Sequence, residues 1–133
     1  MPTSLAVLPK GYEFPSTTFT LSREWVADYI AATGDETTQK LDGDLVPPMA
    51  LAALSIRALI EASPLPPGTL HAGQELSFRR AVRIGEELTA KAHIVSRGER
   101  PGWVLMSVEF KVSAAGEPVM SGRATVTFPA EAA

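Results

Sequence analysis

The sequence predicts an α+β fold in which one antiparallel sheet wraps around a central apolar helix. The segment from Met49 to Ala62 is apolar almost all round, which is typical of a helix buried on most sides. From Thr69 to Phe128 apolar and polar residues alternate, which is typical of strands. One buried helix followed by several long strands gives an α+β plan.

Composition limits the class of protein. The chain has 133 residues, so we expect one domain over residues 1–133, and 45% of them are hydrophobic, enough for a core. The net charge of -3 gives no basic field for nucleic acid or an anionic membrane. Cysteine is absent and the histidines lack metal-ligand spacing, so we expect no disulfide, metal or cofactor. No signal peptide or membrane-length apolar run is present, which favours a cytoplasmic protein.

The first helix is expected over residues 23–33, after an extended lead-in from Met1 to Pro15. Ser22 is a good N-cap residue, and Gly34 is suited to the left-handed position that ends a helix. Residues 35–45 are polar and predict a loop. One apolar stripe at helical spacing comprises Trp25, Val26, Tyr29 and Ile30.

Two prolines precede the central helix. Pro47 and Pro48 suit a helix entry, where a missing N–H costs nothing. Arg57 and Glu61 are four residues apart and predict one solvated stripe near the C-terminal end. The methionines at 49, 106 and 120 are expected to fill the core.

The remaining chain predicts four long strands in a meander, with turns at residues 85–86, 97–102 and 114–118. In the first of these strands, His71 is expected on the face opposite the apolar residues Leu70, Ala72, Leu76, Phe78 and Val82. A curled antiparallel sheet around such a helix is the hotdog architecture. Hotdog sheets commonly pair edge to edge, which hides exposed strand edges, so we expect an oligomer.

Several motifs then resemble one family. Residues 70–89 read LHAGQELSFRRAVRIGEELT, with Leu-His, then Gln-Glu-x-x-Phe, then Gly-acid-x-Leu-Thr in order. Residues 21–35, LSREWVADYIAATGD, are similar to a first helix that runs into Gly-Asp, and residues 46–49, VPPM, to the entry of a central helix. Together they resemble the MaoC-like dehydratase family, N-terminal-domain type, over about residues 14–128.

The resemblance implies addition or removal of water across the α,β carbons of an acyl thioester. The family's catalytic pattern, Asp-x-Asn-Pro-x-His-x-Asp, corresponds to residues 35–42, DETTQKLD. Asp35 then matches the catalytic Asp, and Lys40 stands where the histidine is expected. Imidazole exchanges a proton near neutral pH, whereas a lysine does so only if burial lowers its pKa by several units. The chain can therefore be an altered hydratase or a non-catalytic half of a dehydratase, and Asp35 can also be a plain turn residue.

Further candidate residues would hold the substrate. In the family, the N-terminal end of the central helix polarises the thioester carbonyl, which would involve Pro48, Met49 and Ala50. His71 is either a site residue or a hydrogen-bonded structural histidine. Arg80, clustered with the arginines at 79 and 83, either faces solvent or holds the phosphates of coenzyme A or of a phosphopantetheine arm.

The leading hypothesis is a protein that binds or acts on an enoyl-CoA, a 3-hydroxyacyl-CoA or an acyl-carrier thioester. Its partner would be a second hotdog subunit, in a homodimer or a heterodimer. One alternative is a hotdog thioesterase, for which Glu61 is the only carboxylate on the central helix, although it lies near the C-terminal end. The other is an acyl-binding or assembly module without catalysis.

Overall fold

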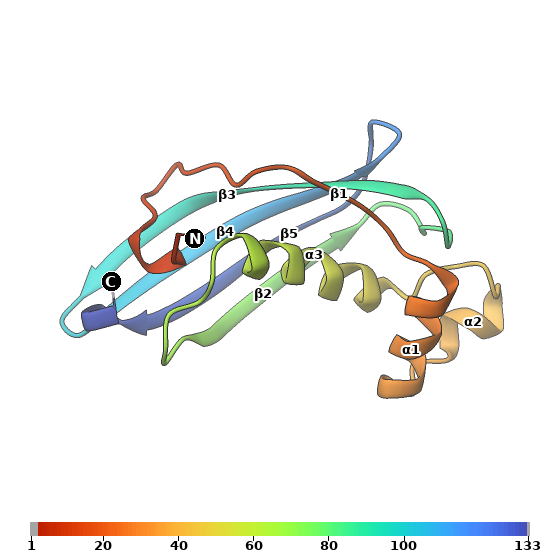
Figure 1. Ribbon diagram of the computed structural model, residues 1–133, viewed down its shortest axis with the longest axis horizontal. Coiled ribbons are helices and arrows are strands. Elements are labelled where there is room, and N and C mark those ends of the chain that lie inside the picture. Colours follow the sequence, from red (N-terminus) through yellow and green to blue (C-terminus); the bar gives the residue numbers. More distant parts are fainter. Residues whose placement is uncertain (1–2, 133) are drawn as a thin grey trace.

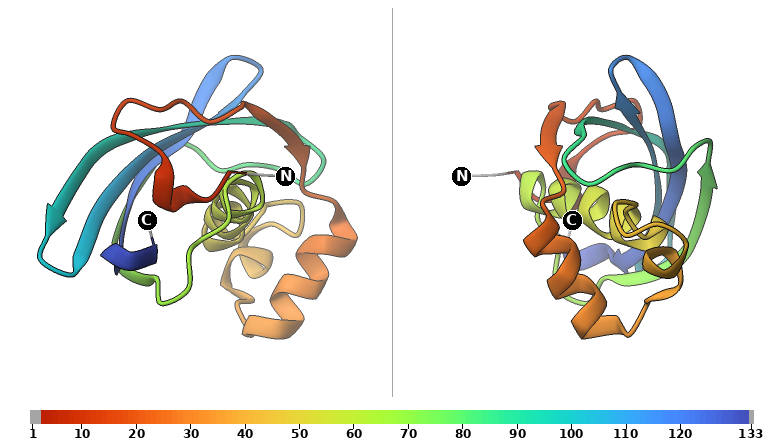
Figure 2. Two further views of the ribbon diagram at one scale, coloured as in Figure 1. Left: turned by 60° about the vertical axis from the view of Figure 1, so that its left-hand side comes forward. Right: turned by 90° about the vertical axis from the view of Figure 1, so that its right-hand side faces the viewer.

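The computed structural model describes residues 3–132 and confirms the predicted α+β hotdog architecture. Five antiparallel strands form one sheet in the order β1-β3-β4-β5-β2. They are β1 (Thr17–Thr20), β2 (Leu70–Phe78), β3 (Glu87–Arg100), β4 (Trp103–Ala114) and β5 (Glu117–Pro129) (Figure 1). The sheet curves around helix α3 (Pro48–Ala62), as Figure 2 shows end-on.

The predicted four-strand meander is wrong in one respect. Strands β3, β4 and β5 are successive hairpins, but β2 pairs with β5 on the far side of the sheet and not with β3. Residues 79–86 carry the chain from one side of the sheet to the other. The alternation of residues predicts which side chains share a face of a strand, but not which strands lie next to it. Only strands joined by a short turn could therefore be predicted to pair. The short edge strand β1 falls in the expected approach to the first helix and was also missed.

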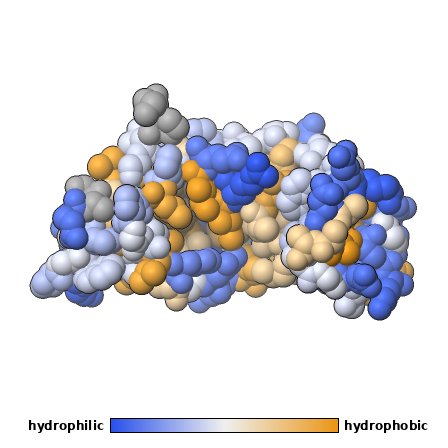
Figure 3. All heavy atoms as spheres, turned by 60° about the horizontal axis from the view of Figure 1, so that its bottom comes forward, coloured by the Kyte–Doolittle hydropathy of each residue, from blue (hydrophilic) through white to orange (hydrophobic). Residues whose placement is uncertain are grey.

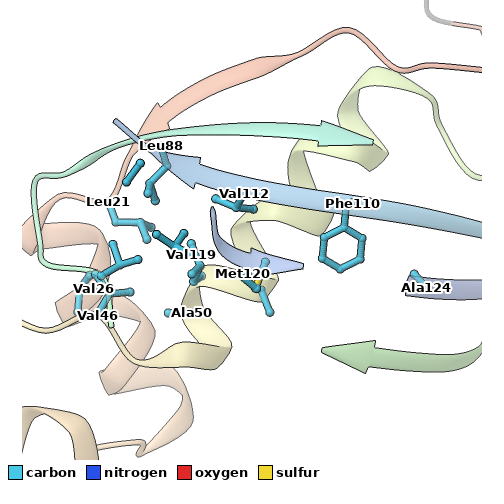
Figure 4. Packing of buried hydrophobic residues seen from close by; sticks show 14 residues of the cluster. Leu21, Val26, Val46, Ala50, Leu88, Phe110, Val112, Val119, Met120 and Ala124 are labelled. Atoms are coloured by element: carbon cyan, nitrogen blue, oxygen red, sulfur yellow. The ribbon is translucent and has the colours of Figure 1, made fainter. Parts of the chain in front are cut away.

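The concave side of the sheet carries two separate hydrophobic cores, one covered by helices and the other by the N-terminal segment. Helix α3 and helix α1 (Arg23–Thr33) cover a core at one end, where Figure 4 shows side chains from both helix entries and three strands meeting. The N-terminal segment covers a second core, with Leu5, Leu8 and Phe14 packed on Met106 and Phe128. This segment was expected only as an extended lead-in, but it carries the short 3-10 turn η1 (Leu5–Val7), and a second such turn, η2 (Ala130–Ala132), follows β5.

Helix α1 matches its prediction at both ends. The Ser22 hydroxyl accepts a hydrogen bond from the Trp25 amide at 3.1 Å, which satisfies one of the free donors of the first turn. Gly34 adopts φ 74° and donates its amide to the Ile30 carbonyl at 2.7 Å.

Helix α3 is less enclosed than predicted. Ala50, Leu51 and Ala52 are buried, but Met49 is 49% exposed and Ile60 39%. The core-filling prediction for Met49 is therefore wrong, whereas Met106 and Met120 are fully buried. Apolar residues thus remain on the surface along one side of this helix.

A β-bulge changes the predicted faces of β2. His71 pairs with Val126 and Gly73 with Thr125, so Ala72 is an extra residue between them. The bulge shifts the alternation, and His71 lies on the same concave face as Leu76 instead of the opposite one. Apart from the half-buried Leu76, every residue of β2 is exposed, because β2 is an edge strand.

Gly122 in β5 is required for close packing between β4 and β2. A Cβ atom at this position would lie 2.6 Å from Cζ of Phe110 and 2.7 Å from the carbonyl oxygen of Glu75. The Phe110 ring, which projects from β4 in Figure 4, fills the space that a side chain would need.

The turn between β4 and β5 has two residues, Ala115 and Gly116, both with positive φ (51° and 82°). Two consecutive positive φ angles are typical of the type I′ turns that suit the twist of a hairpin. Ala115 is the one non-glycine residue with positive φ among residues 3–132. Within that range no helix is long and apolar enough to cross a membrane.

Candidate functional site

The segment between α1 and α3 carries the predicted catalytic pair. Asp35 is half-buried directly after α1, and its amide donates to the Thr33 hydroxyl at 3.3 Å. Burial raises the pKa of the Tyr29 phenol, and the negative charge of Asp35 raises it further. Tyr29 in turn stacks on Trp25, with ring centroids 5.9 Å apart.

Lys40 lies on a short helix, α2 (Thr37–Leu41), within the segment predicted to be a loop. Lys40 is exposed, and its side chain makes no hydrogen bond or ion pair with any described residue. The pair Asp35 and Lys40 is therefore not joined by a direct contact. A lysine that acts as a base is normally enclosed, whereas Lys40 is exposed among the residues that the structure describes.

The entry to α3 is fixed by the connection that follows β2. The Val46 amide donates to the Val82 carbonyl at 2.8 Å, and the Ile84 amide to the Asp44 carbonyl at 2.8 Å. Arg83 donates to the Asp42 carboxylate at 3.2 Å. A hydrogen bond from the Asp44 amide, together with Arg83, lowers the pKa of Asp42. Asp42, the last residue of the family-like motif, thus helps to hold the entry to α3 in place.

The three candidate residues at the start of α3 differ in what they can offer. Pro48 is exposed and has no N–H, and Ala50 is fully buried with its amide donating to the Pro47 carbonyl at 3.0 Å. The Met49 amide has no hydrogen-bond partner among the described residues. Of the three, Met49 is the residue with both a free donor and an exposed side chain.

Arg80 lies apart from these residues. Its guanidinium donates to both carboxylate oxygens of Glu86, at 3.0 and 3.2 Å, and the Arg83 amide donates to Glu86 at 2.7 Å. The Arg80 guanidinium is the largest cause of the lowered pKa of the Glu86 carboxyl. A phosphate bound at Arg80 would have to compete with this bidentate pair.

An open groove of about 590 Å³ runs between the exposed side of α3 and strand β2. Figure 3 shows apolar residues gathered along the middle of this face, between hydrophilic ends. Apolar side chains dominate the lining, and His71 and Gln74 supply polar groups from β2. The lining comprises Met49, Ala52, Ala53, Ile56, Arg57, Ile60, Glu61, His71 and Gln74.

Of the residues predicted to hold the substrate of a hydratase, Met49 and His71 are the two that line this groove, and the bulge in β2 turns His71 towards α3. Gln74 was not singled out, although it belongs to the Gln-Glu-x-x-Phe motif. Arg57 and Glu61 form the expected pair, 2.9 Å apart, at the far end of the groove. Asp35, Lys40 and Arg80 do not line it.

A larger hollow, about 1140 Å³, lies on the convex side of the sheet. Its lining mixes acids and bases, including Glu13, Lys91, His93, Glu109 and Lys111. Such a lining does not suit an acyl chain, so we place the candidate site in the smaller, apolar groove.

A family model for the FAS1-like dehydratase domain region matches residues 9–122. The chain belongs to this family. The resemblance to MaoC-like dehydratases is thereby confirmed. No curated protein matches the sequence of this dehydratase domain.

Solved structures share the fold of this dehydratase domain over nearly their whole length. An (R)-hydratase from A. caviae involved in PHA biosynthesis is 22% identical, with a TM-score of 0.73, and the match covers 90% of this chain and 96% of the other. The MaoC-like dehydratase from Rhodospirillum rubrum is 21% identical, with a TM-score of 0.73 and coverage of 95% and 96%. The HadBC (3R-hydroxyacyl-ACP dehydratase) complex from Mycobacterium tuberculosis is 20% identical, with a TM-score of 0.72 and coverage of 92% and 99%.

Proposed function

We propose that this dehydratase-family domain binds an acyl thioester along the groove between α3 and β2 and does not hydrate or dehydrate it by itself. The groove carries the proposal, because apolar side chains dominate its lining between Met49 and Ile60, and the Met49 amide at its start has no hydrogen-bond partner among the described residues. An acyl chain would lie along the apolar lining, and the Met49 amide would donate to the thioester carbonyl. The 3R-hydroxyacyl-ACP dehydratase and (R)-hydratase named among the structural matches support this class of ligand.

The absence of catalysis rests on Asp35 and Lys40. Hydration needs a group that takes up and returns a proton near neutral pH. Asp35 is present and half-buried, but the exposed Lys40 stands where the family has its histidine. The partner that this proposal assigns is a second hotdog chain, as in the HadBC complex.

Binding is tested with the purified protein and saturated acyl-CoAs of increasing length, by calorimetry. We expect saturable binding that Ala53→Phe weakens at least tenfold, because Ala53 lines the groove and a ring there would fill it. Ala32→Phe, on an exposed part of α1, is the matched control and should bind normally. Sedimentation shows whether both variants keep the oligomeric state of the wild-type protein. No saturable binding of any acyl-CoA would overturn the binding proposal.

Catalysis is tested with crotonyl-CoA and longer enoyl-CoAs. We expect no hydration by the wild-type protein alone. Hydration that is lost in both Asp35→Asn and Lys40→Ala would overturn the non-catalytic assignment. Release of free coenzyme A from a saturated acyl-CoA, abolished by Glu61→Gln, would instead indicate the thioesterase, because a hydratase releases none.

A further inference from the structure

The groove between α3 and β2 is lined by apolar side chains in its middle and by polar ones at the end far from Met49. Arg57 and Glu61 lie in the C-terminal half of α3 and form an ion pair at 2.9 Å. Strand β2 adds His71 and Gln74 to the same lining. An acyl chain bound with its thioester carbonyl at the Met49 amide would therefore meet polar groups at its far end.

The path of the chain places the β2 residues at this far end. Residues 63–69 return the chain from the end of α3 to the start of β2, so β2 runs back along the helix (Figure 1). Beyond the end of β2, the Val82 carbonyl accepts a hydrogen bond from the Val46 amide at the helix entry, at 2.8 Å. His71 and Gln74 belong to the first half of β2 and therefore lie towards the C-terminal half of α3.

The two β2 side chains carry hydrogen-bonding groups that the fold does not use. The bulge at Ala72 puts His71 and Gln74 on the same concave face, and neither side chain makes a hydrogen bond with any described residue. A neutral imidazole and a carboxamide each offer a donor and an acceptor. The charges of Arg57 and Glu61 cancel each other, so these four side chains make a polar end without a dominant charge.

We propose that this end of the groove binds a hydroxyl group at the far end of the acyl chain, so that the preferred ligand is an ω-hydroxyacyl thioester. A hydroxyl both donates and accepts, so it can bond His71 and Gln74 together. A terminal carboxylate fits less well, because it would face the Glu61 carboxylate as well as Arg57. A terminal methyl group would cover these polar side chains without bonding them. The inference rests on the proposed function and names its class of ligand.

The length of α3 indicates how long the acyl chain must be. The helix rises about 12 Å from Met49 to Arg57 and about 18 Å from Met49 to Glu61, at about 1.5 Å per residue. An extended chain of single bonds advances about 1.2 Å per bond, as in an extended peptide, so a hydroxyl about 12 carbons from the thioester reaches the polar end. A hydroxyl about six carbons from the thioester stops in the apolar middle, beside Ala53 and Ile56.

Two pairs of ligands test where the hydroxyl binds. Calorimetry compares dodecanoyl-CoA with 12-hydroxydodecanoyl-CoA, and hexanoyl-CoA with 6-hydroxyhexanoyl-CoA. We expect the hydroxyl to tighten binding of the 12-carbon ligand by about threefold or more, because it gains hydrogen bonds at the polar end. The hydroxyl should weaken binding of the 6-carbon ligand by about tenfold, because Ala53 and Ile56 offer it no partner.

Substitutions in β2 test which side chains bind the hydroxyl. Gln74→Leu and His71→Phe keep an extended side chain at each position but remove its hydrogen-bonding groups, so each should abolish the preference for 12-hydroxydodecanoyl-CoA over dodecanoyl-CoA. Ser96→Leu makes a similar change at an exposed position of β3, a strand that does not line the groove, and should keep the preference. Circular dichroism and sedimentation show whether each variant keeps the fold and the oligomeric state.

A hydroxyl effect of the same sign at both chain lengths, or a preference that survives both Gln74→Leu and His71→Phe, would overturn the assignment of this end. Tighter binding of the mono-CoA thioester of dodecanedioic acid than of 12-hydroxydodecanoyl-CoA would overturn the choice of a hydroxyl. Saturable binding of dodecanoyl-CoA without any preference for the hydroxyl would refute this inference and leave the proposed function standing. No binding of any of these ligands would refute both.

Discussion

Replacement of Gly122 by alanine should destabilise the protein far more than the addition of a methyl group does at a glycine with free space around it. The added Cβ would lie 2.6 Å from Cζ of Phe110 and 2.7 Å from the Glu75 carbonyl oxygen. Ordinary contact between such atoms begins at about 3.5 Å, so each neighbour would have to move by nearly 1 Å. The Phe110 ring can turn, but the Glu75 carbonyl belongs to the ladder between β2 and β5 and is fixed by it.

Overpacking of this kind costs about 1–3 kcal/mol, and we expect a loss near 2 kcal/mol because one of the contacts is with backbone. With an m-value of about 2 kcal/mol/M, the urea midpoint should fall by about 1 M. Tryptophan fluorescence follows the transition, at one protein concentration because association adds to apparent stability.

Gly73→Ala is the matched control in the neighbouring strand, where nothing lies within 4 Å of the added Cβ. It should change stability by less than about 1 kcal/mol. Phe110→Leu removes two of the three close ring and backbone contacts, so Gly122→Ala should cost less in that background, with a coupling of about 1 kcal/mol. An unchanged midpoint for Gly122→Ala, or an equal loss for Gly73→Ala, would refute the steric argument.

Three further predictions concern single sites. Ser22→Ala should cost about 1 kcal/mol in urea unfolding because the Trp25 amide loses its cap, whereas Ser22→Asp should retain most of the stability. Ala115→Gly should raise stability by about 0.5–1 kcal/mol because it removes the strain of a positive φ, and a loss would show that the turn is not strained. Arg80 lowers the pKa of Glu86 in the folded state from an ordinary value of 4.5, so this pair stabilises the fold above about pH 4.5 and the contribution disappears as the pH falls further. Glu86→Gln should therefore reduce stability at neutral pH and flatten the acid limb of the stability–pH profile, and an unchanged limb would contradict the assignment.

The sequence predicted the elements with strong local signals. Helix α1 follows from Ser22 and Gly34, and the hairpins of β3, β4 and β5 from alternation and short turns. The partner of β2 could not be predicted, because pairing across the sheet leaves no periodic signal. The face of His71 was missed for a different reason, since a bulge at Ala72 depends on the ladder with β5.

The candidate site was predicted less completely than the fold. Met49 and His71 were both chosen from motifs, and the structure brings them to one groove. The groove itself could not be predicted from the sequence. An apolar helix indicates that the helix is buried, but it does not indicate which side of the helix stays exposed. The ion pair between Arg80 and Glu86 could not be predicted either, since the two residues are six positions apart in an irregular connection.

The division of the core between α3 and the N-terminal segment has a consequence for folding. Leu5 and Leu8 pack on strands that the ribosome makes about a hundred residues later, and the Leu5 amide bonds the Pro64 carbonyl at 3.0 Å. The β3–β4–β5 hairpins need only local contacts, whereas β1, β2 and the N-terminal segment must find partners far along the chain. Closure of long loops slows folding, so we expect the N-terminal segment to gain its native contacts after these hairpins have formed. Until then its apolar residues are exposed to other chains, so we expect the partly folded chain to aggregate more readily than the folded domain.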